Sequence, residues 1–205
     1  MTIGVTGPFA SGKSTLVQLL GALGAETVSA DGVVHDLLSG DAETIRRVVE
    51  RFGEEVRGES GIDRQALGRE VFGDSAALKD LEGILHPLVR REVSRRAAAS
   101  DADVFVAEIP LLFEVGQEGA YDLTVAVVTS TERRKEWSEE RGVDEPRRRA
   151  IEARQFTGEE KALRADVVVQ NDGDLERLRE QAGELWEMAL RERRSGGSLQ
   201  EQEES

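Results

Sequence analysis

The chain has 205 residues and no cysteine, and its 41 acidic residues outnumber its 27 lysines and arginines to give a net charge of −14. This length allows one domain, or one domain with a sizeable insertion. The lack of cysteine excludes disulfide scaffolds, zinc fingers, thiolate nucleophiles and iron–sulfur sites. The negative charge repels nucleic acids and anionic membranes, and no apolar run is long enough to span a bilayer. We therefore expect a soluble, cytoplasmic protein that binds neither nucleic acid nor membrane.

Five short runs of β-branched and apolar residues indicate buried strands, because they lack the polar/apolar alternation of half-exposed strands. They are Thr2–Thr6, Thr27–Ser29, Val104–Ile109, Leu123–Val128 and Val167–Gln170. Helical patterns lie between them, the plainest over Asp174–Arg191. Strands that alternate with helices predict right-handed crossovers, a parallel sheet and an α/β fold.

Two long excursions interrupt this alternation, which divides the chain into a core (about 1–40, 100–130 and 165–194) and two additions. The first addition, 41–99, is too long for a simple crossover and is expected to be a helical insertion. Its predicted helices are Asp41–Phe52, Arg64–Phe72, Ser75–Ile84 and Pro87–Ala99. The second, 131–164, carries eight basic residues between Arg133 and Arg154 and could fold over a ligand. The Gly/Ser/Glu-rich segment 195–205 is expected to be a disordered tail.

A phosphate-binding pattern follows the first predicted strand. Residues 7–14 read G-P-F-A-S-G-K-S and fit G-x-x-x-x-G-K-[ST], directly before an amphipathic helix. The backbone N–H groups of such a loop wrap a phosphate, and the helix adds the positive end of its dipole. Lys13 is expected to reach the β- and γ-phosphates, and the Ser14 hydroxyl to ligate Mg²⁺. A nucleoside triphosphate is therefore the predicted ligand.

Three classes of nucleotide-hydrolysing or phosphate-transferring enzyme use such a loop. GTPases need Asn-Lys-x-Asp after a late strand, and Gln170-Asn171-Asp172 lacks the lysine. ATPase motors and transporters generally need longer chains. A small-molecule kinase needs an acceptor pocket and an arginine-bearing lid, which the helical insertion and the basic segment fit. A non-catalytic nucleotide sensor is the alternative from another class.

Kinase chemistry also needs a carboxylate that accepts the proton of the attacking hydroxyl. Asp31 follows the predicted strand Thr27–Ser29, which we expect beside the phosphate-loop strand, at the ligand edge of the sheet. An N-cap of the helix Gly32–Leu38 is an equally good interpretation of Asp31 from its spacing alone.

Several segments resemble the dephospho-CoA kinase family, in the same order and over about residues 2–186. They are Val5–Thr15, Ser29–Asp31, Leu81–Pro87, Pro110–Glu114 and Gln155–Asn171. The segments that end in His86-Pro87 and Glu114 are more specific than the phosphate loop, because other small P-loop kinases do not share them. The resemblance implies a three-layer P-loop kinase fold: a five-stranded parallel sheet flanked by helices, with a helical acceptor-binding insertion and a lid.

The resemblance also implies an activity, the last step of CoA biosynthesis. ATP would give its γ-phosphoryl group to the ribose 3′-hydroxyl of dephospho-CoA, with Mg²⁺ as cofactor. Another P-loop kinase of small metabolites is the alternative within the class. A monomer is expected, with a small homo-oligomer as the alternative.

Roles for individual residues follow from the same resemblance. Lys13, Asp31 and Arg141 would be catalytic, Asp31 as general base and Arg141 as a lid arginine that clamps phosphate oxygens. The implied ATP-binding residues are Ala10, Ser11, Gly12, Lys13, Ser14, Thr15 and Asn171. The implied acceptor-binding residues are Asp31, His86 and Leu111. Glu108 is a second candidate ligand of Mg²⁺, through water, beside Ser14.

Some positions depart from the family pattern or keep a second interpretation. Pro8 has no N–H to donate, Ala10 carries a Cβ where glycine is usual, and Trp137 replaces a common lid arginine, so nucleotide affinity could be altered. His86 could instead be a structural histidine at a helix start, and Asn171 part of a strand-end turn. Lys161 is left open between a pocket residue and a surface residue.

Overall fold

The computed structural model describes the backbone of residues 1–203 and the side chains of residues 1–195. The chain forms two compact units. The first combines Met1–Thr27 with the chain from Ser100 onward, and the second is Val28–Ala99. The second unit therefore begins earlier than the insertion expected at residue 41, because the helix that follows Ser29 packs with the inserted helices.

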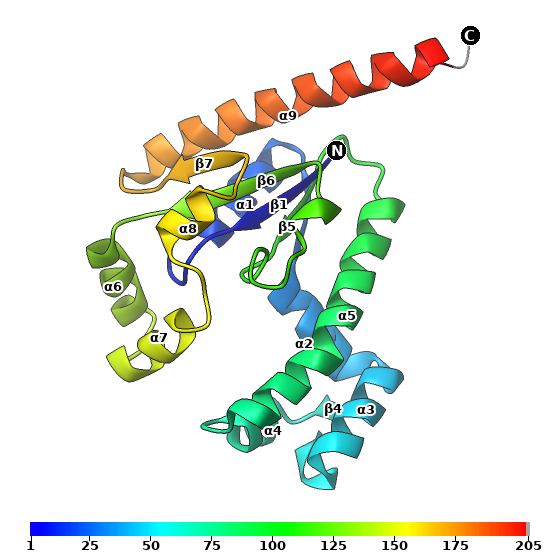
Figure 1. Ribbon diagram of the computed structural model, residues 1–205, viewed down its shortest axis with the longest axis vertical. Helices are drawn as coiled ribbons and strands as arrows, with labels where there is room; N and C mark the ends of the chain where they lie inside the picture. Colours follow the sequence, from blue (N-terminus) through cyan, green and yellow to red (C-terminus); the bar gives the residue numbers. More distant parts are fainter. Residues whose placement is uncertain (204–205) are drawn as a thin grey trace. The chain divides into compact units, whose positions relative to one another are not determined.

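A five-stranded sheet in the order β2-β5-β1-β6-β7 organises the first unit (Figure 1). Its strands are β1 (Thr2–Thr6), β2 (Glu26–Ser29), β5 (Phe105–Glu108), β6 (Leu123–Val128) and β7 (Val167–Gln170). β1 pairs in parallel with β5 and β6, and β6 pairs in parallel with β7. The predicted α/β fold and its parallel sheet are confirmed. The predicted position of β2 beside the phosphate-loop strand is wrong, because the crossover from β1 skips one strand position and β5 fills it.

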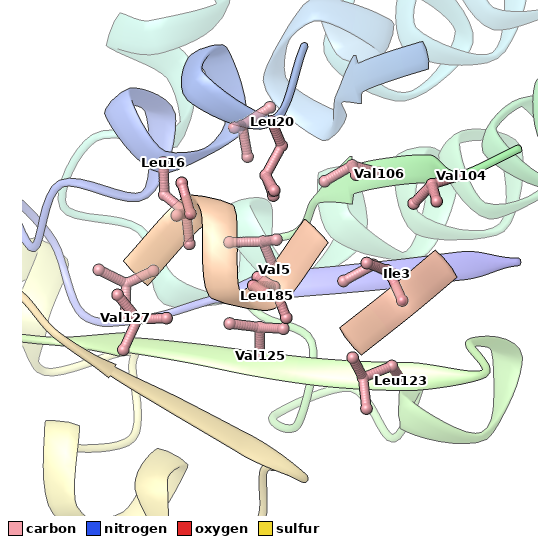
Figure 2. Packing of buried hydrophobic residues seen from close by; sticks show 14 of the residues in the cluster. Ile3, Val5, Leu16, Leu20, Val104, Val106, Leu123, Val125, Val127 and Leu185 are labelled. Atoms are coloured by element: carbon pink, nitrogen blue, oxygen red, sulfur yellow. The ribbon is translucent and has the colours of Figure 1, made fainter. Parts of the chain in front are cut away.

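Helices α1 (Lys13–Leu23) and α9 (Leu175–Glu203) pack against each other over one face of the sheet. Every second strand residue points into this layer, as the pleat requires. The buried side chains shown in Figure 2 are Ile3, Val5, Leu16, Leu20, Val104, Val106, Leu123, Val125, Val127 and Leu185. On the opposite face, Gly4 lies against the Tyr121 ring, and an added Cβ would approach that ring to 2.8 Å.

Helix α9 is longer than the helical pattern over Asp174–Arg191 and runs into the segment 195–205. The helix continues to Glu203, and residues 204–205 lie outside the described part of the chain. Adding residues to an existing helix costs much less than nucleating one, so a long amphipathic helix extends into a segment that would not start a helix by itself. No helix in the described part of the chain is long and apolar enough to cross a membrane.

The second unit consists of helices around an apolar cluster of its own. The helices are α2 (Ala30–Gly40), α3 (Ala42–Phe52), a 3₁₀ turn η1 (Glu54–Val56), α4 (Arg64–Val71) and α5 (Ser75–Ala99). Asp41 and Asp63 cap α3 and α4 by accepting backbone N–H groups three residues further on. Leu67, Leu81 and Leu85 are among the buried members of the cluster.

Two features of this unit differ from the sequence prediction. A short antiparallel hairpin, β3 (Arg57–Gly58) with β4 (Gly61–Ile62), interrupts a segment expected to be only helical. The helices predicted to end at Ile84 and to restart at Pro87 are one continuous helix, α5. Pro87 is tolerated because it is exposed, and the carbonyl that loses its hydrogen bond belongs to Gly83, also exposed.

The basic excursion of the first unit forms three helices, α6 (Thr131–Glu140), α7 (Glu145–Glu152) and α8 (Gly158–Ala162). A 3₁₀ turn, η2 (Glu118–Ala120), lies between β5 and β6. α8 packs against β6. The Lys161 side chain of α8 reaches Thr6, which is on the same face of β1 as Gly4. α8 therefore lies on the face of the sheet opposite α1 and α9.

Candidate active site

The phosphate loop connects β1 to α1 and requires unusual backbone angles. Gly12, the residue before α1, has φ +92°, a left-handed conformation that favours glycine. Ala10 has φ +59° and is the one non-glycine residue with positive φ among those described. A side chain there costs about 1–2 kcal/mol relative to the right-handed region. Ala10 therefore holds a left-handed conformation that glycine would adopt at a lower cost.

The two residues that end the motif have polar partners inside the first unit. The Lys13 ammonium is buried and donates to the carbonyl of Pro8 at 3.0 Å, across the loop. The Ser14 hydroxyl donates to Glu108 Oε1 at 2.9 Å. β5 pairs directly with β1, so Glu108 at the end of β5 lies at the same sheet edge as the loop. The structure thus brings Ser14 and Glu108, both candidate magnesium ligands, together.

These two side chains suit Mg²⁺ as it is usually bound with nucleotides. Both offer hard oxygen donors, and Mg²⁺ is commonly held by one or two protein oxygens, with substrate phosphates and waters completing six ligands. The described residues contain no cluster of three or more histidine, cysteine or acidic side chains that would form an all-protein metal cage. A metal here would therefore depend on the phosphates of the nucleotide.

Asn171, which follows the edge strand β7, supports the phosphate loop. Its side-chain amide donates to the carbonyl of Ser11 at 2.9 Å, and the residue is only 6% exposed. An added Cβ at Gly12 would lie 2.1 Å from the same amide nitrogen, so glycine is needed there for space as well as for φ. Asn171 follows β7 in sequence, as predicted, but its side chain fixes the loop. The interpretation as a strand-end turn misses this contact.

A cavity of about 230 Å³ opens beside the loop. Gly12, Thr15, Trp137, Arg141 and Asn171 are among the residues that line it. The structure therefore gathers several of the predicted ATP-binding residues and the predicted lid arginine around one space. Its mixture of an aromatic ring, apolar groups and convergent polar groups is typical of a site for an organic ligand. Trp137, which departs from the family pattern, is part of this lining and lies beside the Arg133 guanidinium, 5.4 Å from the ring centre.

The segment between α7 and α8 contacts the start of the loop. The N–H of Phe9 donates to Gln155 Oε1 at 2.7 Å, and Gly158 lies against the Pro8 ring. Pro8 therefore contributes packing to the loop and no N–H donor. Lys161, left open from sequence, is fully buried, which excludes the surface interpretation. The contacts of Phe9 with Gln155 and of Pro8 with Gly158 were not predictable, because the partners are about 150 residues apart in the chain.

The remaining predicted residues lie in different settings. Leu111 is half-buried in the loop after β5. Asp31 and His86 belong to the second unit. Asp31 is exposed in the first turn of α2, whose N-cap is Ser29, so the N-cap interpretation of Asp31 is wrong. His86 is half-buried in the middle of α5 rather than at a helix start, and burial lowers the pKa of its imidazole.

A parallel sheet with a phosphate loop between β1 and α1, a serine–carboxylate pair beside it and three helices between β6 and β7 defines a P-loop kinase of small molecules. The family model of dephospho-CoA kinase matches residues 1–177, and the chain belongs to this family.

Individual relatives agree with this assignment. A dephospho-CoA kinase of Frankia casuarinae is 39% identical over 194 residues, which cover 94% of this chain and 85% of that one. A solved protein of Thermus thermophilus superposes with a TM-score of 0.77 at 36% identity, over 91% of this chain and 97% of the other. The solved dephospho-CoA kinase of Campylobacter jejuni gives a TM-score of 0.63 at 25% identity, over 92% and 96%.

Proposed function

We propose that this protein transfers the γ-phosphoryl group of ATP to the ribose 3′-hydroxyl of dephospho-CoA, giving CoA and ADP. The observation that carries the proposal is the intact Gly12-Lys13-Ser14 end of the phosphate loop, in a chain of the dephospho-CoA kinase family. The Ser14 hydroxyl of this loop donates a hydrogen bond to the Glu108 carboxylate. A sensor that only bound nucleotide would not need Lys13 and Ser14 in these positions. The geometry therefore favours phosphoryl transfer over simple binding.

The phosphate loop would hold the ATP phosphates by its backbone N–H groups and the start of α1. Pro8 contributes no N–H, the N–H of Phe9 is taken by Gln155 and that of Ser11 by the Pro8 carbonyl, so the donors for phosphate come from Ala10 and from Gly12 onward. On ATP binding, the Lys13 ammonium would replace its hydrogen bond to the Pro8 carbonyl with one to a phosphate oxygen. When bound, Mg²⁺ would neutralise charge on the β- and γ-oxygens, with Ser14 as direct ligand and Glu108 through water. Arg141, which lines the cavity, would add a planar donor pair for phosphate oxygens.

The second unit would supply the acceptor side. Asp31, exposed in the first turn of α2, is the proposed general base for the ribose hydroxyl. His86 of this unit and Leu111 of the first unit are the proposed contacts to dephospho-CoA. Lowering of its pKa by burial favours a neutral His86, which can donate one hydrogen bond and accept another. We further propose that the enzyme works in the cytoplasm as a monomer, without nucleic-acid or membrane partners. The net charge of −14 supports the last point, because it repels nucleic acids and anionic membranes.

An acceptor panel tests the proposed reaction. The protein is incubated with Mg-ATP and, in separate reactions, dephospho-CoA, adenylate, shikimate or gluconate, and products are identified by mass. CoA from dephospho-CoA, with no product from the other acceptors, supports the proposal. Phosphorylation of another acceptor instead would make the protein a different small-metabolite kinase. Tight ATP binding without any product would make it a sensor.

Asp31→Asn tests the assignment of the base. The amide keeps the shape but cannot accept the proton, so turnover should fall by about 100-fold or more while the dissociation constant of ATP stays nearly unchanged. The measurement is CoA formation at saturating substrates, with ATP affinity from calorimetry. An unchanged turnover would remove Asp31 as the base.

A further inference from the structure

A buried ion pair ties helix α8, which lies between β6 and β7 in the chain, to the two loops of the phosphate site. Lys161 of α8 is fully buried, and its ammonium forms an ion pair with Glu114 at 2.8 Å. The ammonium also donates to Thr6 Oγ1 at 3.1 Å and to the carbonyl of Pro110 at 2.8 Å. All three ammonium donors are therefore used, as a buried charge requires.

The partners of Lys161 lie at functionally relevant positions. Thr6 is the last residue of β1 and precedes Gly7, where the phosphate loop starts. Pro110 lies two residues after Glu108, the partner of Ser14. One ammonium therefore joins the start of the phosphate loop to the loop that carries the candidate magnesium ligand.

The Glu114 carboxylate extends the connection to the segment between α7 and α8. Its Oε1 accepts the N–H of Phe156 at 2.7 Å, next to Gln155, which holds the N–H of Phe9. α8 is itself fixed by a capping box between Thr157 and Glu160. Burial lowers the pKa of Lys161, and the neighbouring carboxylate opposes this change by favouring the charged form.

We propose that Lys161 is a positioning residue for phosphoryl transfer, which sets the entry of β1 into the phosphate loop relative to the Glu108 loop through Thr6, Pro110 and Glu114. The proposal rests on the kinase activity proposed above. Buried ion pairs are often neutral for stability compared with an apolar replacement of similar size, so stability alone is a weak reason for this one. Two loops that share one metal–phosphate cluster need a fixed separation, and a hydrogen-bonded ammonium supplies it better than an apolar contact, because its bonds are directional.

The test compares Lys161→Met, Glu114→Gln and the double variant Lys161→Met/Glu114→Gln with the wild type. The turnover number and the dissociation constant of Mg-ATP, by calorimetry, are measured well below the melting temperature of each variant. The melting temperature itself is measured by a thermal melt. Leu185→Ala is the matched control, since it removes a buried side chain of the same unit from the α9 layer. It should lower the melting temperature and leave turnover and ATP affinity of the folded protein unchanged.

Lys161→Met should lower turnover by about 100-fold, as expected when reacting groups are displaced by about 1 Å. It should weaken Mg-ATP binding by about tenfold, the effect of one lost hydrogen bond in a desolvated site. The double variant removes the uncompensated carboxylate and should regain melting temperature. Its turnover should stay low, because the bonds to Thr6 and Pro110 remain absent.

A purely structural pair gives the opposite pattern. Recovery of wild-type turnover and ATP affinity together with melting temperature in the double variant would overturn the proposal, as would a folded Lys161→Met with wild-type kinetics. If Lys161→Met does not fold, the double variant and Glu114→Gln carry the comparison. If the wild type makes no CoA, the proposed function fails, and the Mg-ATP dissociation constants still decide whether Lys161 positions the loop.

Discussion

The phosphate-loop region and the helical unit Val28–Ala99 are stabilised by different kinds of contact. In the phosphate-loop region, polar side chains reach across long stretches of sequence, as in Asn171 to Ser11 and Gln155 to Phe9. In the helical unit, the polar contacts at helix starts are local, such as the N-cap Asp63. Its ion pair between Arg51 and Asp80 spans more of the sequence but is exposed, and a buried apolar cluster provides the long-range packing.

Because of this difference, we expect substitutions in the two regions to affect different quantities: nucleotide binding and turnover in one, and the free energy of unfolding in the other. A directional bond fixes one loop position, so its loss should change binding and turnover with a modest change in stability. An apolar cluster acts through buried area, so its truncation should change stability with little effect on nucleotide binding. The predictions below test this separation in each region.

Lys13→Ala should have the largest effect. Removing the ammonium deprives the transferring phosphoryl group of its main protein charge, so turnover should fall by about 1,000-fold. The melting temperature should change little, since the lost bond to Pro8 lies within the loop. The measurements are CoA formation and a thermal melt. Near-normal turnover in this variant would refute the phosphate-loop assignment.

Leu67→Ala tests the helical unit. Leu67 is buried in the apolar cluster of this unit, so its truncation should cost about 2–5 kcal/mol of unfolding free energy. ATP affinity of the folded protein should stay at the wild-type value. Urea unfolding and calorimetry with Mg-ATP measure the two effects. A parallel loss of ATP affinity would mean that the two regions are energetically coupled.

Asn171→Leu tests one long-range bond of the phosphate-loop region. Leucine is similar in size but cannot donate to the Ser11 carbonyl, so ATP should bind about tenfold more weakly. The unfolding free energy should fall by about 1–3 kcal/mol, because a buried carbonyl loses its partner. The same calorimetric titration measures the affinity. Unchanged affinity would limit Asn171 to a structural role.

Acid should destabilise both regions slightly, through one carboxylate in each. Hydrogen bonds from Arg95 and Arg96 hold the pKa of Glu92 at about 2, and the N–H of Ser130 is the main cause of a pKa of about 2 for Asp172. Both pKa values lie below those of the unfolded chain. The stabilisation is therefore complete above about pH 5 and is lost as the pH falls toward 2.

Solvent screening keeps each contribution below about 1 kcal/mol. Glu92→Gln and Asp172→Asn should each flatten the pH dependence of unfolding between about pH 5 and pH 2. Urea unfolding at several pH values measures the slope. A slope equal to that of the wild type in both variants would show that other carboxylates control acid stability.

The sequence predicted what depends on local pattern. Three of the five strands have the predicted bounds, the predicted Thr27–Ser29 begins one residue after β2 does, and the predicted Val104–Ile109 extends β5 by one residue at each end. The phosphate loop followed from a motif whose spacing is fixed by the phosphate itself. Asp41 marked a helix start because a capping side chain bonds only three residues ahead.

What the sequence did not reveal depends on contacts between distant segments. Lys161 lies in a short helix among charged residues, where a lysine is usually solvated, and only Thr6, Pro110 and Glu114 explain its burial. Pro87 predicted a helix break, but its exposed side faces away from the packed leucines and α5 continues. The position of β2 depends on which strand enters the sheet later, which local pattern cannot express.

Transfer of an isotopic label tests the central claim most directly. ATP that carries heavy oxygen in its γ-phosphoryl group is mixed with dephospho-CoA, Mg²⁺ and either the wild type or Lys13→Ala, and the mass of the product and the phosphorylated hydroxyl are determined. The account predicts labelled phosphate on the ribose 3′-hydroxyl with the wild type and almost none with Lys13→Ala. Label released only as free phosphate by the wild type, or equal transfer by both proteins, would contradict it.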